Sequence, residues 1–351
     1  MPLGMLYEAF WSPSFWLPRG IDWATFESRN ESMRYPQARD MFYPVVLGVA
    51  LLLLRLLLES FLFLPVGYWT GHYSKFIPME KPLTEIVVGH LTGGFSKQSK
   101  TKKCLESAWL LWFYTTAFVY GCYVMFDKPW LWQVRLCWED YPHHHIDRDT
   151  RWFYIFQASF YWSCMISSLT DTRRKDFWMM MTHHAVSSLL LYISWTINFV
   201  RVGTLLLLSH DLSDVLLNVG KVVKYSDLPP IYVNVVFVVF MATWLGTRLG
   251  YFPFVLLRSA LFEAPGIIQK SYRWENLLQA PHVPRVIIGM LVALLVMHVV
   301  WTYVILKIAL VTATKGAAED VRSDSEEEEQ EAATTGATEG ELKGADAKKI
   351  L

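Results

Sequence analysis

Two adjacent histidines and two aspartates lie within apolar stretches of this sequence. His183 and His184 occur in the stretch 177–199, and Asp211 and Asp214 occur in the next one, 202–223. Ionisable side chains are costly in hydrocarbon, so four of them on successive apolar stretches indicate a functional site. A histidine beside a carboxylate suits general base catalysis, because the carboxylate fixes the tautomer and stabilises the imidazolium that forms. An imidazole could also act as a nucleophile that accepts an acyl group.

The spacing of these residues predicts that they lie at a similar depth. With ~1.5 Å of rise per helical residue, His183 lies roughly 9 Å from the start of its stretch and Asp214 roughly 13 Å from the end of the next. Asp211 and Asp214 share a helix face at a spacing of three, as do His210 and Asp214 at a spacing of four. His183 and His184 point about 100° apart, so one can face a reactant while a partner holds the other.

Two other interpretations of the four residues stay open. Hydrogen bonds between helices could lock the bundle without any chemistry. Histidine and aspartate are also ordinary metal ligands, although membrane di-iron enzymes carry several histidine boxes and this chain has one adjacent pair. We expect no metal. His143, His144 and His145 belong to a loop predicted to lie on the opposite, lumenal side, and are expected to be plain polar loop residues.

The elements that position these residues are predicted to be membrane-spanning helices. The chain has 351 residues, of which 53% are hydrophobic, and seven apolar stretches approach the ~20 residues that a bilayer requires. These stretches are 43–64, 105–126, 152–169, 177–199, 202–223, 231–251 and 286–310. We therefore predict an all-α integral membrane protein with about seven transmembrane helices. Arg55 and Glu59 interrupt the first stretch, the third is short and the fifth carries the polar residues, so a six-span arrangement is the alternative.

Basic residues predict the orientation of the spans, because short cytosolic connections retain lysine and arginine. They gather in three connections that share one side if there are seven spans: Lys75, Lys81, Lys97, Lys100, Lys102 and Lys103; Arg173, Arg174 and Lys175; and Lys221 and Lys224. This arrangement predicts a lumenal N-terminus and a cytosolic C-terminus. Asn30 begins an Asn-Glu-Ser glycosylation acceptor sequence in the segment assigned to the lumen.

The remaining segments divide by composition. We expect a lumenal N-terminal segment at 1–42, a first span at 43–65, a cytosolic linker at 66–104 and a catalytic membrane domain at 105–310. Residues 311–351 form an acidic tail that is predicted to be disordered and cytosolic. Ser323 and Ser325 precede acidic residues there and would suit an acidophilic kinase, although a solvated tail without regulation is the alternative.

The region around the histidines and aspartates resembles a known family. RRKDFWMMMTHHAVSSLLLYISWTINFVRVGTLLLLSHDLSDVLLNVGKVVKY closely resembles the Lag motif of ceramide synthases, within the TRAM-Lag-CLN8 (TLC) domain. The likeness extends to CLESAW at 104–109, DKPWLW at 127–132 and RLGYFP at 248–253, and covers about 105–310. The resemblance implies a six-helix TLC bundle preceded by one N-terminal span.

The resemblance also implies an activity and a set of roles. It implies transfer of a fatty acyl group from acyl-CoA, a co-substrate, to the amine of a sphingoid base, in the endoplasmic reticulum membrane and with no separate cofactor. His183 would be the base or the acyl-accepting nucleophile, and His184 a companion base. Asp211 and Asp214 would orient the histidines and balance their charge. The amine must lose its proton before it attacks, so a buried base matters.

Further residues are candidates for substrate binding. Arg173, Arg174 and Lys175 stand at the predicted cytosolic mouth, where they could meet the phosphates of CoA or simply set the topology. A second set, comprising Asn198, Arg201 and His210, is assigned to substrate contact, with a structural role as the alternative for Asn198 and Arg201. The family places an acyl-chain selectivity loop between the last two spans, which corresponds here to the stretch from Glu263 to Arg273.

Partners and rival functions complete the expectations. Some relatives insert a homeodomain-like segment of roughly 60 residues after the first span, but only 66–103 is available here. No nucleic-acid motif accompanies the lysines, so we expect no nucleic-acid partner. The resemblance is compatible with a homodimer, a heterodimer or an accessory subunit. The rival functions are a noncatalytic lipid-binding or trafficking protein with the same domain, and a CoA-dependent acyltransferase with another acceptor.

Overall fold

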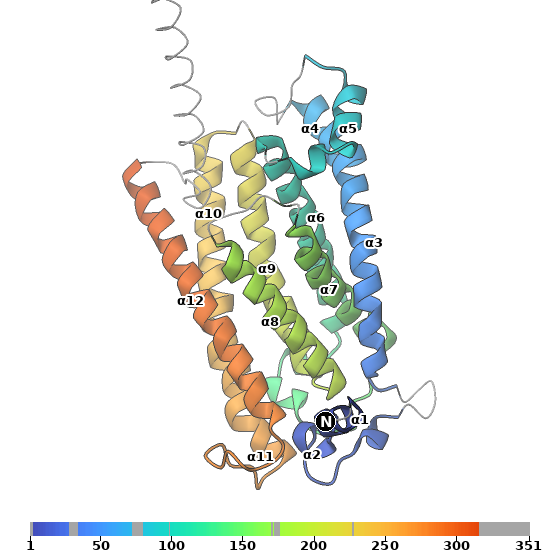
Figure 1. Ribbon diagram of the computed structural model, residues 1–351. Coiled ribbons are helices and arrows are strands. Elements are labelled where there is room, and N and C mark those ends of the chain that lie inside the picture. The colour runs from blue at the N-terminus through green and yellow to red at the C-terminus, as the bar shows by residue number, and fades with distance from the viewer. Residues whose placement is uncertain are drawn as a thin grey trace, which may run out of the picture.

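The protein is a bundle of long helices that run side by side (Figure 1). The structure, a computed structural model, describes residues 3–27, 34–71, 80–97, 99–169, 171, 176–226 and 228–315. Within these ranges the regular elements are all helical. The all-α membrane class predicted from the sequence is confirmed. Predicted features at Asn30, at Arg173, Arg174 and Lys175, and at Ser323 and Ser325 lie outside the described residues.

The helices follow one another along the chain, and their connections vary in length. Two short helices come first, α1 (Leu3–Phe10) and α2 (Pro13–Trp16). The longer rods are α3 (Tyr43–Leu58) continued by η3 (Glu59–Phe63) and α4 (Leu64–Thr70), then α6 (Lys100–Met125), α7 (Arg148–Ser167), α8 (Phe177–Thr196) and α9 (Val200–Tyr225). The last two are α10 (Pro230–Trp244) with η7 (Leu245–Leu257), η8 (Ser259–Glu263) and α11 (Ala264–Ile268), and α12 (Val283–Lys315). A separate helix, α5 (Leu83–Leu91), lies beside α4.

Five helical segments in the described chain are long and apolar enough to cross a membrane: Ala38–Thr70, Lys100–Met125, Val200–Tyr225, Pro230–Ile268 and Val283–Thr312. The protein is therefore a multi-pass membrane protein. Helices α7 and α8 fall outside this group, because α7 is rich in polar residues and α8 carries the histidine pair. The count of seven spans stays a prediction.

Helices α7 and α8 are shorter than the helices around them. Each has 20 residues, whereas α6 and α9 have 26, a difference of about 9 Å in length. In Figure 1 they end below the upper ends of α6 and α9. At the end of the bundle where α9 finishes, α7 and α8 therefore stop short of their neighbours (Figure 1).

A buried charge network explains the polar residues that interrupt the first apolar stretch. Arg55 Nε lies 2.7 Å from Glu59 Oε1, and Arg55 Nη2 lies 2.8 Å from Asp171 Oδ1. His90 of α5 lies 3.2 Å from the other oxygen of Glu59. Buried charges are tolerated when they are paired in this way. The network joins α3 and η3 to the segment after α7 and to α5.

The opposite end of the bundle is closed by the N-terminal segment. Trp16, Leu17 and Phe26 pack against Ile193 and Ile197 at the end of α8. Backbone atoms reinforce this packing, since His282 N donates to Phe15 O at 2.9 Å. The first residues of the chain therefore cover one end of the helix bundle, next to α11 in Figure 1.

Several helix boundaries differ from the predicted ones. The sixth stretch was expected to end at 251, but the helical rod continues to Ile268, because Leu256, Leu257 and Ala264 continue its buried face. Helix α12 likewise continues to Lys315, five residues into the segment assigned to the tail. The segment assigned to the linker is helical at both ends, where α4 ends at Thr70 and α6 begins at Lys100.

Candidate active site

The histidine pair lies on α8 among aromatic rings from two other helices. The ring centroids of His183 and His184 are 5.6 Å apart. Tyr161 of α7 contacts both, at 6.4 Å from His183 and 6.1 Å from His184. Trp301 of α12 meets His183 edge-on at 5.4 Å, and its Nε1 donates to Asp176 Oδ2 at 3.2 Å. These contacts hold the imidazole of His183 between α7, α8 and α12.

A cavity of about 330 Å³, here called the polar cavity, opens beside the histidines at the end where α9 finishes. Its lining includes His183, His184, Asp214 and Arg248. Other ionisable residues line it nearer its mouth: Glu106, Asp171, Asp176, Lys221 and Lys224. The sequence expectation that the histidines and Asp214 lie at a common depth agrees with their shared cavity.

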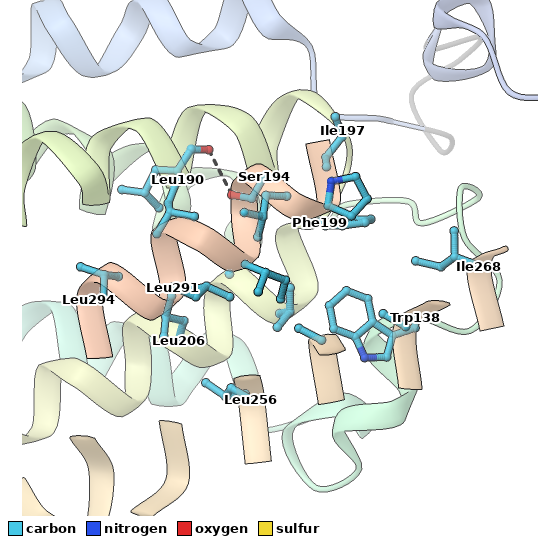
Figure 2. Close-up of a pocket in the computed structure, with 18 of the residues that line it drawn as sticks. Trp138, Leu190, Ser194, Ile197, Phe199, Leu206, Leu256, Ile268, Leu291 and Leu294 are labelled. Atoms are coloured by element: carbon cyan, nitrogen blue, oxygen red, sulfur yellow. Dashed lines mark hydrogen bonds between the residues drawn. The ribbon is translucent and has the colours of Figure 1, made fainter. Parts of the chain in front are cut away.

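A second cavity, here called the apolar cavity, extends from His183 toward the N-terminal segment and has a volume of about 130 Å³. Figure 2 shows its lining, in which side chains from α8, α9, η7, α11 and α12 converge: Leu190, Ser194, Leu206, Leu256, Ile268, Leu291 and Leu294. Tyr154 and Ser194 share a hydrogen bond at its wall. The apolar lining suits a hydrocarbon chain.

His183 is the histidine that lines both cavities. His184 lines the polar cavity alone, and His210 lines the apolar cavity alone. The buried Nδ1 atoms of His183 and His184 have no hydrogen-bond partner among the described residues. Buried polar atoms of this kind call for a partner, and a reactant in the adjoining cavity can provide one.

The two aspartates make different contacts from those expected. Asp211 is buried and accepts a hydrogen bond from Gln157 Nε2 of α7. Asp214 accepts from Arg248 Nη2 at 2.7 Å. Over the described residues, neither carboxylate is hydrogen-bonded to His183 or His184. The predicted direct orientation of the imidazoles by the aspartates is therefore absent from this structure, because other cationic and amide groups compete for the carboxylates.

Arg248 of η7 is the central polar residue that the sequence reasoning missed. Its Nε donates to Ser213 Oγ at 3.1 Å and its Nη1 to His298 Nε2 at 3.1 Å. The guanidinium also lies 5.0 Å from the Trp244 ring and is almost fully buried. Both Arg248 and His298 are ionisable residues inside apolar stretches, so the criterion that selected His183 would have selected them too.

Two residues assigned to substrate contact, with a structural role as the alternative, make structural contacts here. Asn198, at φ 62°, donates through Nδ2 to the carbonyls of Pro142 and His144 at 3.0 and 2.9 Å. Arg201 donates to Leu136 O at 2.9 Å and stacks on Trp130 at 4.8 Å. Neither lines the polar or the apolar cavity. Their polar groups tie the 136–144 loop to the α8–α9 turn.

The loop histidines also differ from expectation at one position. His144 is buried, and its Nε2 lies 2.5 Å from Glu139 O. Burial and the nearby charge of Arg201 lower the pKa of His144 to about 4. His144 is therefore a buried, neutral structural residue rather than a plain polar residue of the loop.

The stretch from Glu263 to Arg273 borders the far end of the apolar cavity. Its first part is helical rather than a loop, since α11 extends to Ile268. Glu263 accepts from Ser259 Oγ at 2.6 Å, and Arg273 Nη1 donates to backbone carbonyls at 3.1 Å. Between these two polar ends, cavity-lining residues occur at Ala264, Pro265, Ile268, Gln269 and Tyr272. The stretch therefore forms an end wall.

No cluster of three or more histidine, cysteine, aspartate or glutamate side chains in the described part of the chain could hold a metal ion. The site is instead a polar cavity and an apolar cavity that meet at one imidazole. Such an arrangement can hold a polar reactant and a hydrocarbon chain on the two sides of a base or nucleophile.

Comparison with known proteins identifies the family. A model of the TLC domain family matches residues 103–307, more than half of the chain. The sequence is 42% identical to ceramide synthase hyl-1 of Caenorhabditis elegans, over 90% of this chain and 83% of that protein. The chain belongs to the ceramide synthase family. It is also 34% identical to ceramide synthase hyl-2 of the same organism and 33% identical to human ceramide synthase 5, over 88% and 92% of this chain and 91% and 88% of those proteins.

The TLC-domain match spans most of the residues that line the two cavities. His183, Asp214, Arg248 and Trp301 all lie within 103–307. The N-terminal segment that closes the apolar cavity lies outside the matched region, and contributes Trp16 and Pro18 to its lining.

Proposed function

We propose that this protein is a ceramide synthase, which transfers a fatty acyl group from acyl-CoA to the amino group of a sphingoid base. The observation that carries the proposal is the position of His183 between the polar and apolar cavities. An acyl thioester has the same division, with a hydrocarbon chain on one side of the reacting carbonyl and a charged carrier on the other. Family membership supports the same substrates.

The reaction needs a proton acceptor. A sphingoid amine attacks the thioester carbonyl only as the free base, so a proton must leave its nitrogen as the C–N bond forms and the C–S bond breaks. In the proposed mechanism His183 takes that proton and returns it to the CoA thiolate. An equivalent two-step course transfers the acyl group first to His183 and then to the amine.

The neighbouring residues are proposed to support His183. His184 contacts its ring from within the same helix and lines the polar cavity, as a companion base would. Asp214 supplies negative charge at that cavity while Arg248 fixes its position. Asp211, held by Gln157, is proposed to act through the packing of α7 against α9. The proposal includes no metal and no cofactor beyond the co-substrate acyl-CoA.

We also propose the endoplasmic reticulum membrane as the location, with the N-terminus in the lumen and the polar cavity facing the cytosol. Soluble acyl-CoA would then reach the polar cavity directly. Arg173, Arg174 and Lys175, which belong to the connection between α7 and α8, remain candidates for contact with its phosphates. A dimer or an accessory subunit remains an expectation from the family.

The direct test is an assay of the purified full-length protein with a panel of acyl-CoAs and sphingoid bases. We expect formation of N-acyl sphingoid base and release of one free CoA per product, detected by mass spectrometry and thiol titration. Absence of product with every pair, in protein that remains folded, would favour a lipid-binding role. Acylation of a different amine or alcohol in place of the sphingoid base would assign another acyltransferase activity.

A further inference from the structure

One face of α9 continues from the reacting centre to the mouth of the polar cavity. Asn218, Lys221 and Lys224, here called the α9 strip, follow Asp214 at spacings of four, seven and ten residues. All three line the polar cavity. Spacings of four and seven place residues on one face of a helix. The strip is therefore a row of polar side chains leading outward from the histidines.

Asn218 has a polar atom that no described residue satisfies. Its Nδ2 donates to Asp214 O at 2.8 Å, but its buried Oδ1 has no hydrogen-bond partner. The residue is only 2% exposed, so this acceptor faces the interior of the site. A buried carbonyl in this position is suited to accept an N–H from a molecule that occupies the cavity.

We propose that the α9 strip binds the carrier part of acyl-CoA, with Asn218 accepting a hydrogen bond from a pantetheine amide and Lys221 and Lys224 contacting the phosphates. The inference rests on the proposed function and assigns residues to its co-substrate. In this arrangement the lysines bind the anionic end of the carrier, and Asn218 binds its amide-bearing arm.

The dimensions agree with this assignment. Ten residues of helix separate Asp214 from Lys224, an axial distance of ~15 Å. The pantetheine arm joins the thioester sulfur to the first phosphorus by 13 bonds, about as many as four amino acid residues, and so reaches ~15 Å when extended. Its two amides fall between these ends, and Asn218 lies ~6 Å from Asp214 along the helix.

Cations already balance two of the acidic side chains on the other walls of the polar cavity. Glu106 and Asp171 line the same cavity, but each lies within 4 Å of the cationic groups of Arg55 and Lys102. Asp176 accepts a hydrogen bond from Trp301. Lys221 and Lys224 both belong to the last turns of α9, one half-buried and one exposed, where multiply charged phosphates can approach them.

The test compares two acyl donors on the full-length protein: palmitoyl-CoA, and palmitoyl-pantetheine, which has the amides but no phosphates. The double variant Lys221→Gln/Lys224→Gln should raise the KM for palmitoyl-CoA about tenfold, the size expected for losing charge-assisted contacts. Its kcat/KM with palmitoyl-pantetheine should stay within about twofold of the unsubstituted protein, because that donor lacks the contacted phosphates. Raising the salt concentration should shrink the difference in KM with palmitoyl-CoA.

Two further variants sharpen the comparison. Asn218→Ala should raise the KM for both donors by a similar factor, since both carry the amides. Lys307→Gln removes an exposed lysine of α12 that does not line the polar cavity. This variant should leave the KM for both donors unchanged. The assignment would be overturned if the double lysine variant lost kcat/KM equally with the two donors, or if its KM for palmitoyl-CoA did not change. Lack of ceramide formation by the unsubstituted protein with either donor would instead contradict the proposed function.

Discussion

Arg248 Nη2 and Asp214 Oδ2 lie 2.7 Å apart and join η7 to α9 at the floor of the polar cavity. The same guanidinium holds Ser213 and His298. This ion pair fixes the only predicted catalytic carboxylate that lines the polar cavity. The position of Asp214 therefore depends on a residue of the neighbouring helical rod.

Removing Arg248 alone should destabilise the protein more than removing Arg248 and Asp214 together. We expect Arg248→Leu to lower the free energy of unfolding by about 3 kcal/mol, because it leaves a buried carboxylate without its partner. The double variant Arg248→Leu/Asp214→Leu should recover part of that loss, since no unpaired charge remains. Thermal unfolding in detergent measures both effects. Additive losses in the double variant would show that the two side chains are energetically independent.

The end wall of the apolar cavity should set the longest acyl chain that fits. Ile268 lines this end, whereas Phe262 of η8 is exposed and does not. Enlarging Ile268 to Trp should shift the preferred acyl-CoA toward shorter chains, because the added ring fills space that the chain would occupy. Competition among acyl-CoAs of graded length measures the preference. The matched variant Phe262→Trp should leave it unchanged, and an unchanged profile in Ile268→Trp would argue that the chain lies elsewhere.

His144 should make stability depend on acid. Its pKa is about 4 in the folded protein against about 6.5 when unfolded, so the unfolded state binds more protons as pH falls. The stability associated with neutral, buried His144 is fully present above pH 6.5 and is lost as pH falls toward 4. We expect a loss of about 2 kcal/mol between pH 7 and pH 5. The unfolding temperature of His144→Asn should show a smaller decrease over that range, and an identical decrease would exclude His144 as the cause.

Much of the architecture could be predicted from the sequence, because hydrocarbon imposes length and apolarity on every span. The histidine pair and Asp214 were found by the same logic, since each is an ionisable residue in an apolar stretch. Arg248 and His298 carry that signal as well, but neither has another charged residue or histidine within five positions, whereas the histidines and aspartates occur in pairs.

The pairing of side chains could not be predicted, because it depends on how helices rotate against one another. Spacing along α9 correctly placed Asp214 near the histidines, but it could not show that Gln157 and Arg248 compete for the carboxylates. Asn198 and Arg201 likewise have polar groups that suit either a substrate or a backbone carbonyl. Only the folded loop at 136–144 shows that they bind carbonyls.

The central claim is that acyl transfer takes place at His183, where the two cavities meet. Its most direct test measures N-acylation of sphinganine by His183→Ala and by His145→Ala, a loop histidine that lines neither cavity, at matched protein levels in microsomes. The account predicts that His183→Ala lowers the rate at least 100-fold, as removal of a base or nucleophile does, while His145→Ala keeps full activity. Retained turnover in correctly folded His183→Ala would contradict it.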